Sequence, residues 1–383
     1  MRADITAVAH VLVFCMLCVL VPGQSQPSAS DDALANFRPR REMHNRELAG
    51  SEICARCHVQ KARQFSQSSM AHALGGVATN DVLRVHPHLT FRAGNYAYEI
   101  TYDGANAIYR VSYGNQSISE PIAYVFGNAR VAQTYVLRHN GKLYEGRVSY
   151  YSGIDALDWT IGDALNPPPS LDEAFGRDIT GDEARNCFSC HGTAAVSGGR
   201  LALDQLIPGV SCEACHGPGL LHAEVMQSGR ADDLSIFNPK MLDPDTLDQE
   251  FCGACHRSAN TVGMMPDLGG ISNVRFQPYR LASSRGHDSN DPRFACTACH
   301  DPHHDLPQQG ASSDSKCTVC HSAPVLLGTT EKATSSKIVA KSCRVSNSGC
   351  DGCHMPKVEI PGAHFQFTDH RIRIVRPGEK FPM

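Results

Sequence analysis

Two cysteines separated by two residues, and followed at once by a histidine, recur seven times along this chain of 383 residues. The pattern takes up fourteen of the seventeen cysteines, and no other feature of the sequence constrains the fold as strongly. The seven copies are Cys54/Cys57/His58, Cys187/Cys190/His191, Cys212/Cys215/His216, Cys252/Cys255/His256, Cys296/Cys299/His300, Cys317/Cys320/His321 and Cys350/Cys353/His354.

The spacing CxxCH is the attachment signature of c-type haem. Two thiols three positions apart can add to the two vinyl groups on one porphyrin edge, and the next residue then lies over the iron as an axial imidazole ligand. We therefore expect seven covalently attached haem c groups. Folding should require haem, because only 7% of the residues are aromatic and the porphyrins would supply the missing apolar surface.

Disulfides, structural zinc and iron-sulfur clusters are the alternatives for a chain this rich in cysteine. Structural zinc joins two CxxC pairs or adds two spaced histidines, and it does not require a histidine after every second cysteine. Iron-sulfur clusters use cysteine runs without that histidine. The seven identical spacings favour haem over disulfides as well. Cys343 stands outside the motifs and is assigned no role.

The ligand at the sixth iron position separates an electron carrier from a catalyst. A Gly-Pro-Gly turn precedes His222, and Pro302 precedes His303, so both histidines can turn toward a neighbouring haem. His139 stands beside an expected Asn-Gly turn and is a weaker candidate. The candidate distal ligands are His72, His222, His287, His303, His364 and His370.

The chain begins like an exported protein. Residues 1–25 show a basic residue, an apolar run and then small or polar residues, the layout of a cleaved signal peptide. A retained membrane anchor is the alternative. We expect a mature protein in the periplasm or on the outer cell surface.

Three further segments follow the signal peptide. Residues 26–76 hold the first motif, and residues 187–383 form a six-haem cytochrome domain with short helices and Gly/Pro-rich loops. Between them, residues 77–186 lack the motif, and period-two alternation around Asp103-Gly104 and Asn140-Gly141 indicates antiparallel hairpins. The expected fold is mostly α and irregular, organised by stacked haems, with a small antiparallel β subdomain inserted.

Charge and composition limit the partners. A net charge of -4 gives no basic patch of the kind that nucleic acid requires, so nucleic acid is excluded as an expected partner. The expected partners are redox proteins that donate and accept electrons, with membrane-bound electron-transfer components among the candidates.

Four stretches of the chain resemble the multihaem c-type cytochromes related to cytochrome c-552/c-554. They are "SQSSMAHAL", "CEACHGPGLLH", "RFQPYRLASSRGHDSNDPRFACTACHDPH" and "DGCHMPKVEIPGAHFQFTDHRIRI". The resemblance implies haems stacked in close pairs, mostly bis-histidine irons and service as an electron carrier. It also implies axial-ligand roles for His222, His287, His303, His364 and His370.

An enzyme is the alternative function. The chain is similar in its haem-rich character to multihaem nitrite reductases and hydroxylamine-oxidising enzymes, which need one iron with an open coordination position. No motif here has the CxxCK form that marks the catalytic haem of many such reductases. We therefore expect electron transfer, with catalysis at one open haem as the competing hypothesis.

Overall fold

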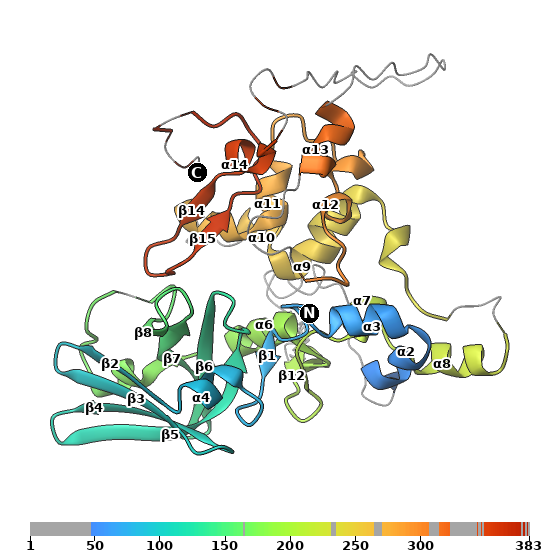
Figure 1. Ribbon diagram of the computed structural model, residues 1–383. Helices are drawn as coiled ribbons and strands as arrows, with labels where there is room; N and C mark the ends of the chain where they lie inside the picture. Colours follow the sequence, from blue (N-terminus) through green and yellow to red (C-terminus); the bar gives the residue numbers. More distant parts are fainter. Residues whose placement is uncertain are drawn as a thin grey trace, which may run out of the picture.

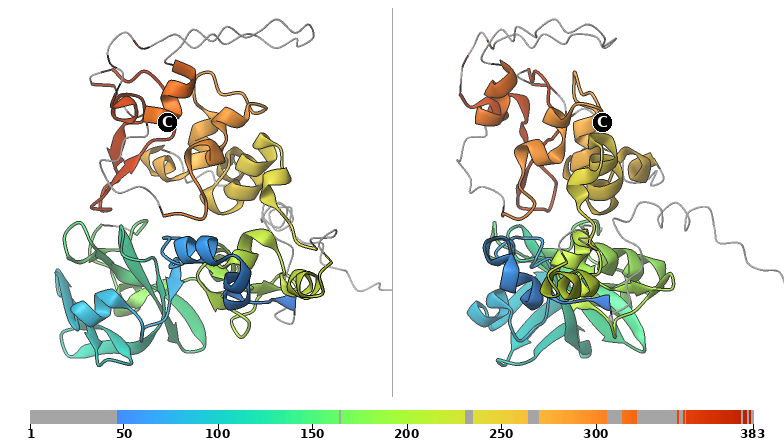
Figure 2. Two further views of the ribbon diagram at one scale, coloured as in Figure 1. Left: turned by 45° about the vertical axis from the view of Figure 1, so that its right-hand side comes forward. Right: turned by 90° about the vertical axis from the view of Figure 1, so that its right-hand side faces the viewer.

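The computed structural model describes residues 47–163, 165–230, 235–263, 270–305, 314–321, 343, 346, 348–376, 378, 379 and 381. The predicted signal peptide lies outside the described residues. The β-sheet and the helices up to residue 230 form one layer, and the helices from residue 246 on lie above it (Figures 1 and 2). No helix in the described ranges is long and apolar enough to cross a membrane.

One antiparallel sheet of nine strands dominates the first layer. Strands β2 to β8 follow one another in sequence order, β1 pairs with β5, and β9 pairs with β7. The strands are β1 (Leu74–Gly75), β2 (His88–Ala93), β3 (Tyr96–Tyr102), β4 (Ala107–Tyr113), β5 (Gln116–Phe126), β6 (Ala132–His139), β7 (Lys142–Tyr151), β8 (Ala156–Trp159) and β9 (Gly176–Asp178).

Tight turns built on positive φ angles join neighbouring strands. Gly94 and Gly114 each open a two-residue turn at φ 58° and 57°, and Asn140-Gly141 forms the turn between β6 and β7 at φ 49° and 76°. Two-residue turns of this kind match the right-handed twist of antiparallel strands. The sequence therefore folds each strand back on the one before it.

The sheet buries its alternate side chains and curls until its ends approach. On β3 and β4, Tyr98, Ile100 and Tyr109 are almost fully buried, whereas the residues between them are more exposed, as the two-residue strand period requires. Phe91 of β2 lies 5.1 Å, ring centroid to centroid, from Trp159 of β8. The first and last strands of the main path thus meet around one core, and the sheet is nearly closed.

The expected fold class is wrong in its proportions. The β part is a large, nearly closed sheet rather than a small inserted subdomain. Sequence patterning identified the turns at Asp103-Gly104 and Asn140-Gly141 but not the two Gly-Asn turns, and β5 has little alternation to reveal it. The rest of the described chain is a cysteine-rich region of short helices joined by turns and loops.

The described helices are short. α6 spans ten residues, and the others are shorter. They are α2 (Ser51–Cys57), α3 (Val59–Phe65), α4 (Asp81–Val85), α5 (Leu171–Phe175), α6 (Asp182–His191), α7 (Cys212–His216), α8 (Leu220–Gln227), η2 (Pro239–Met241), η3 (Thr246–Cys252), α9 (Gly253–His256), α10 (Ala259–Gly263), η5 (Gly270–Arg275), α11 (Gln277–Ala282), η6 (Pro292–Phe294), α12 (Cys296–Cys299), α13 (Asp314–His321) and α14 (Cys350–His354).

Three small hairpins accompany these helices. They pair β10 (Gly192–Thr193) with β13 (Ile207–Pro208), β11 (Val196–Ser197) with β12 (Arg200–Leu201), and β14 (Lys357–Glu359) with β15 (Gln366–Thr368). The loop between β14 and β15 reaches the sheet, where His364 Nε2 lies 2.6 Å from Asp158 Oδ2 of β8 (Figure 1). This contact joins the C-terminal region to the first layer.

Apolar cores of different size hold the two layers. Around the sheet, eighteen buried residues form one cluster, and a second cluster packs α6 against β1, β6 and β7 through Ala184 and Phe188. In the described part of the upper layer, the buried cluster consists of Val274, Ile360 and Ala363. Such a cluster is small for so much chain, which agrees with an interior completed by porphyrins.

Replacing a core residue of the sheet should lower its stability far more than the same replacement at the surface. Ile100 is fully buried, whereas Ile154 is 43% exposed. We expect Ile100→Ala to lower the free energy of unfolding by about 2–5 kcal/mol and Ile154→Ala by about 0.5 kcal/mol or less. Denaturant unfolding can be followed by the fluorescence of Trp159, the only tryptophan. Equal losses in the two variants would contradict this core.

Candidate haem-binding sites

The motif cysteines lie on single turns of short helices. Cys54 and Cys57 lie on α2, Cys187 and Cys190 on α6, and the remaining described motifs on α7, on the junction of η3 with α9, and on α12, α13 and α14. A helical turn of 3.6 residues brings positions i and i+3 to one face. The two cysteine side chains of a motif therefore share the face that a porphyrin edge would occupy.

The second cysteines of the motifs differ in their exposure. Cys215 on α7 and Cys255 on α9 are partly buried, whereas Cys353 on α14 is exposed, as Cys57 and Cys299 are. All five are thiols outside any disulfide. Within the described ranges, no group of three or more histidine, cysteine and acidic side chains is placed to hold a metal ion. Neither finding tests the predicted thioether bonds, so haem attachment at Cys215, Cys255 and Cys353 stays a prediction.

α6 shows how the sheet holds one of these helices. Phe188, fully buried, packs edge-on against Tyr124 and Phe126 of β5 at ring-centroid distances of 4.9 and 5.0 Å. The ring of His191 lies 5.1 Å from that of Phe126, and His191 Nδ1 lies 3.0 Å from the carbonyl oxygen of Ala73. The helix that carries the second motif is thus fixed on the sheet.

Three motif histidines face a histidine from a distant part of the chain. The ring centroids of His58 and His222 are 6.3 Å apart, and their planes are 17° from parallel. The ring centroids of His216 and His303 are 6.1 Å apart, with planes 18° from parallel. The rings of His300 and His370 lie 6.2 Å apart at 38°. Each pair joins one motif histidine to one predicted distal histidine.

Hydrogen bonds fix the ring nitrogens in two of these pairs. His216 Nδ1 lies 3.0 Å from the carbonyl oxygen of Phe237, and His370 Nδ1 lies 3.1 Å from that of Thr368. A carbonyl oxygen only accepts, so Nδ1 carries the proton and the lone pair of the neutral ring is on Nε2. His303 Nδ1 lies 3.0 Å from Asp301 Oδ1, which has the same effect.

Desolvation favours the neutral form of His216, His300 and His370. It lowers the pKa of His216 and of His300. It also lowers the pKa of His370 to about 4, against the opposing effect of the hydrogen bond to Thr368. An imidazole must be neutral to bind a metal. The protein therefore presents these rings in the protonation state that iron ligation requires.

The three pairs have the spacing of a metal held between two imidazoles. Metal–nitrogen bonds of about 2.0–2.1 Å on both sides place the two ring centroids about 6 Å apart, as observed for each pair. The cysteines of the same motif lie within the same helical turn. The residues present thus fit a haem attached by thioether bonds and ligated by two histidines.

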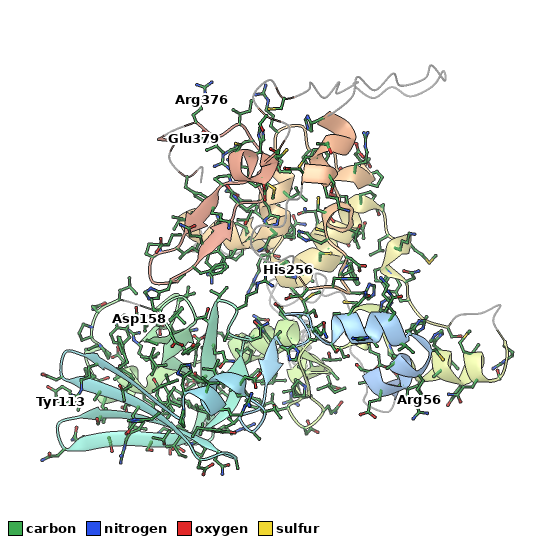
Figure 3. All side chains as sticks on the ribbon, in the orientation of Figure 1. Arg56, Tyr113, Asp158, His256, Arg376 and Glu379 are labelled. Atoms are coloured by element: carbon green, nitrogen blue, oxygen red, sulfur yellow. The ribbon has the colours of Figure 1, made fainter. Side chains whose placement is uncertain are left out.

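The other motif histidines have different neighbours. His354 Nδ1 lies 2.8 Å from the carbonyl oxygen of Arg373. His256 lies beside the side chain of Gln277, and desolvation lowers its pKa; it lies between the sheet and the upper helices (Figure 3). His321 is exposed at the end of α13. The side chain of Cys320 lies outside the described residues.

Three predicted distal ligands make other contacts in this structure. His364 Nε2 lies 2.6 Å from Asp158 Oδ2, and His72 Nε2 lies 2.8 Å from the carbonyl oxygen of Ser66. The ring of His287 lies 6.0 Å from that of Phe294. None of these contacts tests iron ligation, so their assignments stay predictions.

A buried ion pair next to His370 was missed by sequence reasoning. Arg280 and Asp369 are 1% and 0% exposed, and Arg280 Nε and Nη2 donate to the two carboxylate oxygens of Asp369 at 2.8 and 2.9 Å. Burial alone would raise the pKa of Asp369, but the bonds from Arg280 and the backbone of Arg371 outweigh it and lower that pKa. An aspartate directly before a predicted ligand was the one available signal.

Comparison with known protein families finds a match for one segment of the chain. Residues 170–217 match the family model described as cytochrome c554 and c-prime, and this segment contains the second and third motifs. The resemblance to cytochrome c-552/c-554-like proteins is therefore confirmed for this segment. No curated protein matches the chain.

A solved structure, that of the outer cell wall cytochrome OcwA, is also similar. The identity is 18% and the TM-score 0.32, over 55% of this chain and 37% of the other, so this chain spans just over a third of that structure's length. The family match covers a segment with two of the motifs, and it implies covalent haem c there.

Removing Asp369 should destabilise the C-terminal region strongly. Asp369→Ala leaves Arg280 as a buried charge without its partner, which costs about 3–5 kcal/mol in the free energy of unfolding. As a control, Asp81→Ala removes a carboxylate that is 83% exposed from its pair with Arg84, and we expect little change. Thermal unfolding followed by circular dichroism measures both. A small effect of Asp369→Ala would contradict the buried ion pair.

Proposed function

We propose that this protein is an exported seven-haem c-type cytochrome that transfers electrons through bis-histidine haems. The observation that carries the proposal is the set of three histidine ring pairs, each joining a motif histidine to one distant in sequence at 6.1–6.3 Å. The four other motifs have the same CxxCH spacing, which extends the proposal to seven haems.

The chain's own residues would orient and retain the haems. Carbonyl oxygens of Phe237 and Thr368 hold His216 and His370 with Nε2 available as a ligand. The ion pair between Arg280 and Asp369 fixes the backbone at His370. A bound haem supplies a one-electron iron couple, and its potential depends on axial ligands, burial and nearby charge. Two filled axial positions leave the iron no place for a substrate.

Location and partners belong to the same proposal. The layout of residues 1–25 supports export, and covalent attachment keeps haem from being lost outside the cytoplasm. We place the protein in the periplasm or on the outer cell surface. Its partners would be redox proteins, membrane-bound electron-transfer components among them.

The first test counts haems and asks which irons have two ligands. Mass spectrometry of the purified holoprotein should show seven attached haems. Electron paramagnetic resonance of the oxidised protein should then show low-spin iron throughout, with no change on adding nitrite or cyanide. A high-spin iron that binds these ligands would replace the carrier proposal with the enzyme alternative, a multihaem oxidoreductase with one open haem.

Removing one distal histidine should open one iron. We expect His303→Ala to convert one of the seven haems to a high-spin form that binds cyanide, because His303 faces His216. The neighbouring His304, 47% exposed in its side chain, provides the control, and His304→Ala should leave the low-spin spectrum unchanged. Identical spectra for the two variants would contradict the assignment of His303.

A further inference from the structure

The haem-motif helices α2, α12 and α14 begin without a capping side chain of their own, as α6, α7 and α9 do. The residues at the N-caps of α2, α12 and α14 are Gly50, Ala295 and Gly349, and none donates or accepts a side-chain cap bond. By contrast, α4 and α5 are capped by their own Asn80 and Ser170. The first N–H groups of any helix lack a partner within it. For α2, α12 and α14, the hydrogen-bond partner of these N–H groups is a side chain beside another haem motif.

Glu213 supplies this hydrogen-bond partner to α2. This residue lies between the two cysteines of the third motif and is 1% exposed. Its carboxylate accepts from the backbone N–H of Ala49 at 2.7 Å and of Gly50 at 3.0 Å, just before the first motif. It also accepts from Gly219 at 2.8 Å, at the start of the helix that carries His222. One buried carboxylate therefore joins the helices that bear both members of the pair His58 and His222.

Asp248 and Asp314 make the same connection elsewhere. Asp248, 4% exposed and four residues before Cys252, accepts from the N–H of Cys296 at 3.0 Å through Oδ1 and at 3.2 Å through Oδ2. Asp314, three residues before Cys317, accepts from the N–H groups of Gly349 and Cys350, both at 2.8 Å. In each case an acid beside one motif caps the helix of another.

The capped motifs also bring their first cysteines together. The thiol of Cys54 interacts with that of Cys212, Cys252 with Cys296, and Cys317 with Cys350. In addition, Cys212 Sγ lies 3.7 Å from Ser51 Oγ on α2. These are the same three partnerships that the carboxylates make. Because each cysteine would hold the edge of one porphyrin, two porphyrin edges would meet at every such contact.

We propose that Glu213, Asp248 and Asp314 are positioning residues that lock the haem motifs into three pairs: first with third, fourth with fifth, and sixth with seventh. Each of these carboxylates lies beside one motif and caps the helix of another. It thereby sets the separation and orientation of two porphyrins, and with them the electronic coupling between the two haems. The inference rests on the proposed haem attachment, and it adds which haems form pairs and which side chains hold them.

The experiment measures coupling between haems in the full-length holoprotein. Porphyrins in close contact give a two-signed circular-dichroism couplet in the Soret band, and its amplitude depends on their separation and relative orientation. We expect Asp248→Ala and Asp314→Ala each to retain seven haems by mass and to lose part of this amplitude. The double variant should lose the sum of the two, because the sites are independent. Asp245→Ala, an exposed acid three residues before Asp248, should leave the couplet unchanged.

Asparagine variants distinguish the loss of a hydrogen bond from the loss of the carboxylate charge. Asp248 receives a single N–H, so the amide oxygen of Asp248→Asn can still accept it, and the couplet should return to the wild-type amplitude. Asp314 receives two N–H groups on two oxygens, so Asp314→Asn should lose one bond and restore the couplet only in part. Equal couplets for Asp248→Asn and Asp248→Ala would overturn the capping role.

The remaining outcomes also decide between the proposals. A wild-type protein without attached haem would refute the proposed function itself. Seven attached haems with no couplet, or with a couplet that neither alanine variant changes, would overturn only the pairing. If Asp248→Ala loses haem, peptide mass should place the loss at the fourth and fifth motifs alone. A loss spread over all motifs, with an unchanged couplet in Asp314→Ala, would overturn the pairing.

Discussion

Helices of three to ten residues are not stable on their own in water, and every helix described in this protein's later chain is of that length. The sheet can bury its own side chains, as Ile100, Tyr109 and Trp159 show. The upper layer has a small buried cluster in its described part. Its order must therefore come from something other than aliphatic packing, and porphyrins at its four motifs, each joined to two cysteine side chains, would provide it. The proposed cofactor is a structural element as much as a redox centre.

Polar contacts join the two layers. Asp305, just after the fifth motif, accepts from Arg130 beside β6 and from the backbone and hydroxyl of Ser69. Lys61 on α3 pairs with Asp301, and His364 contacts Asp158. Asp301 in turn bonds His303, which faces His216 of the third motif. The predicted haem ligands His303 and His216 thus lie next to the same polar contacts that connect the layers.

Local patterns in the sequence predicted the parts that depend on near neighbours. Asn140-Gly141 predicted a hairpin, because a tight turn depends on residues a few positions apart. His222, His303 and His370 were predicted as candidate ligands, but their partners were not, since ring pairs join distant segments. The carboxylate of Glu213 contacts a backbone group 164 residues away. No periodicity or spacing in the sequence predicts such a contact. The size of the sheet was missed because β5 has no regular alternation of buried and exposed residues.

The contact between Glu213 and Gly50 can form only after the segment between them has been synthesised. Every strand from β1 to β9 is synthesised after the first motif and before Glu213. Thioether bonds at Cys54 and Cys57 can form early, yet the cap on α2 and the second imidazole at His58 arrive only with α7 and α8. A newly attached first haem would therefore remain half-liganded and accessible while the whole sheet emerges. With the proposed ligands, the first haem site would be complete only after the third motif has emerged.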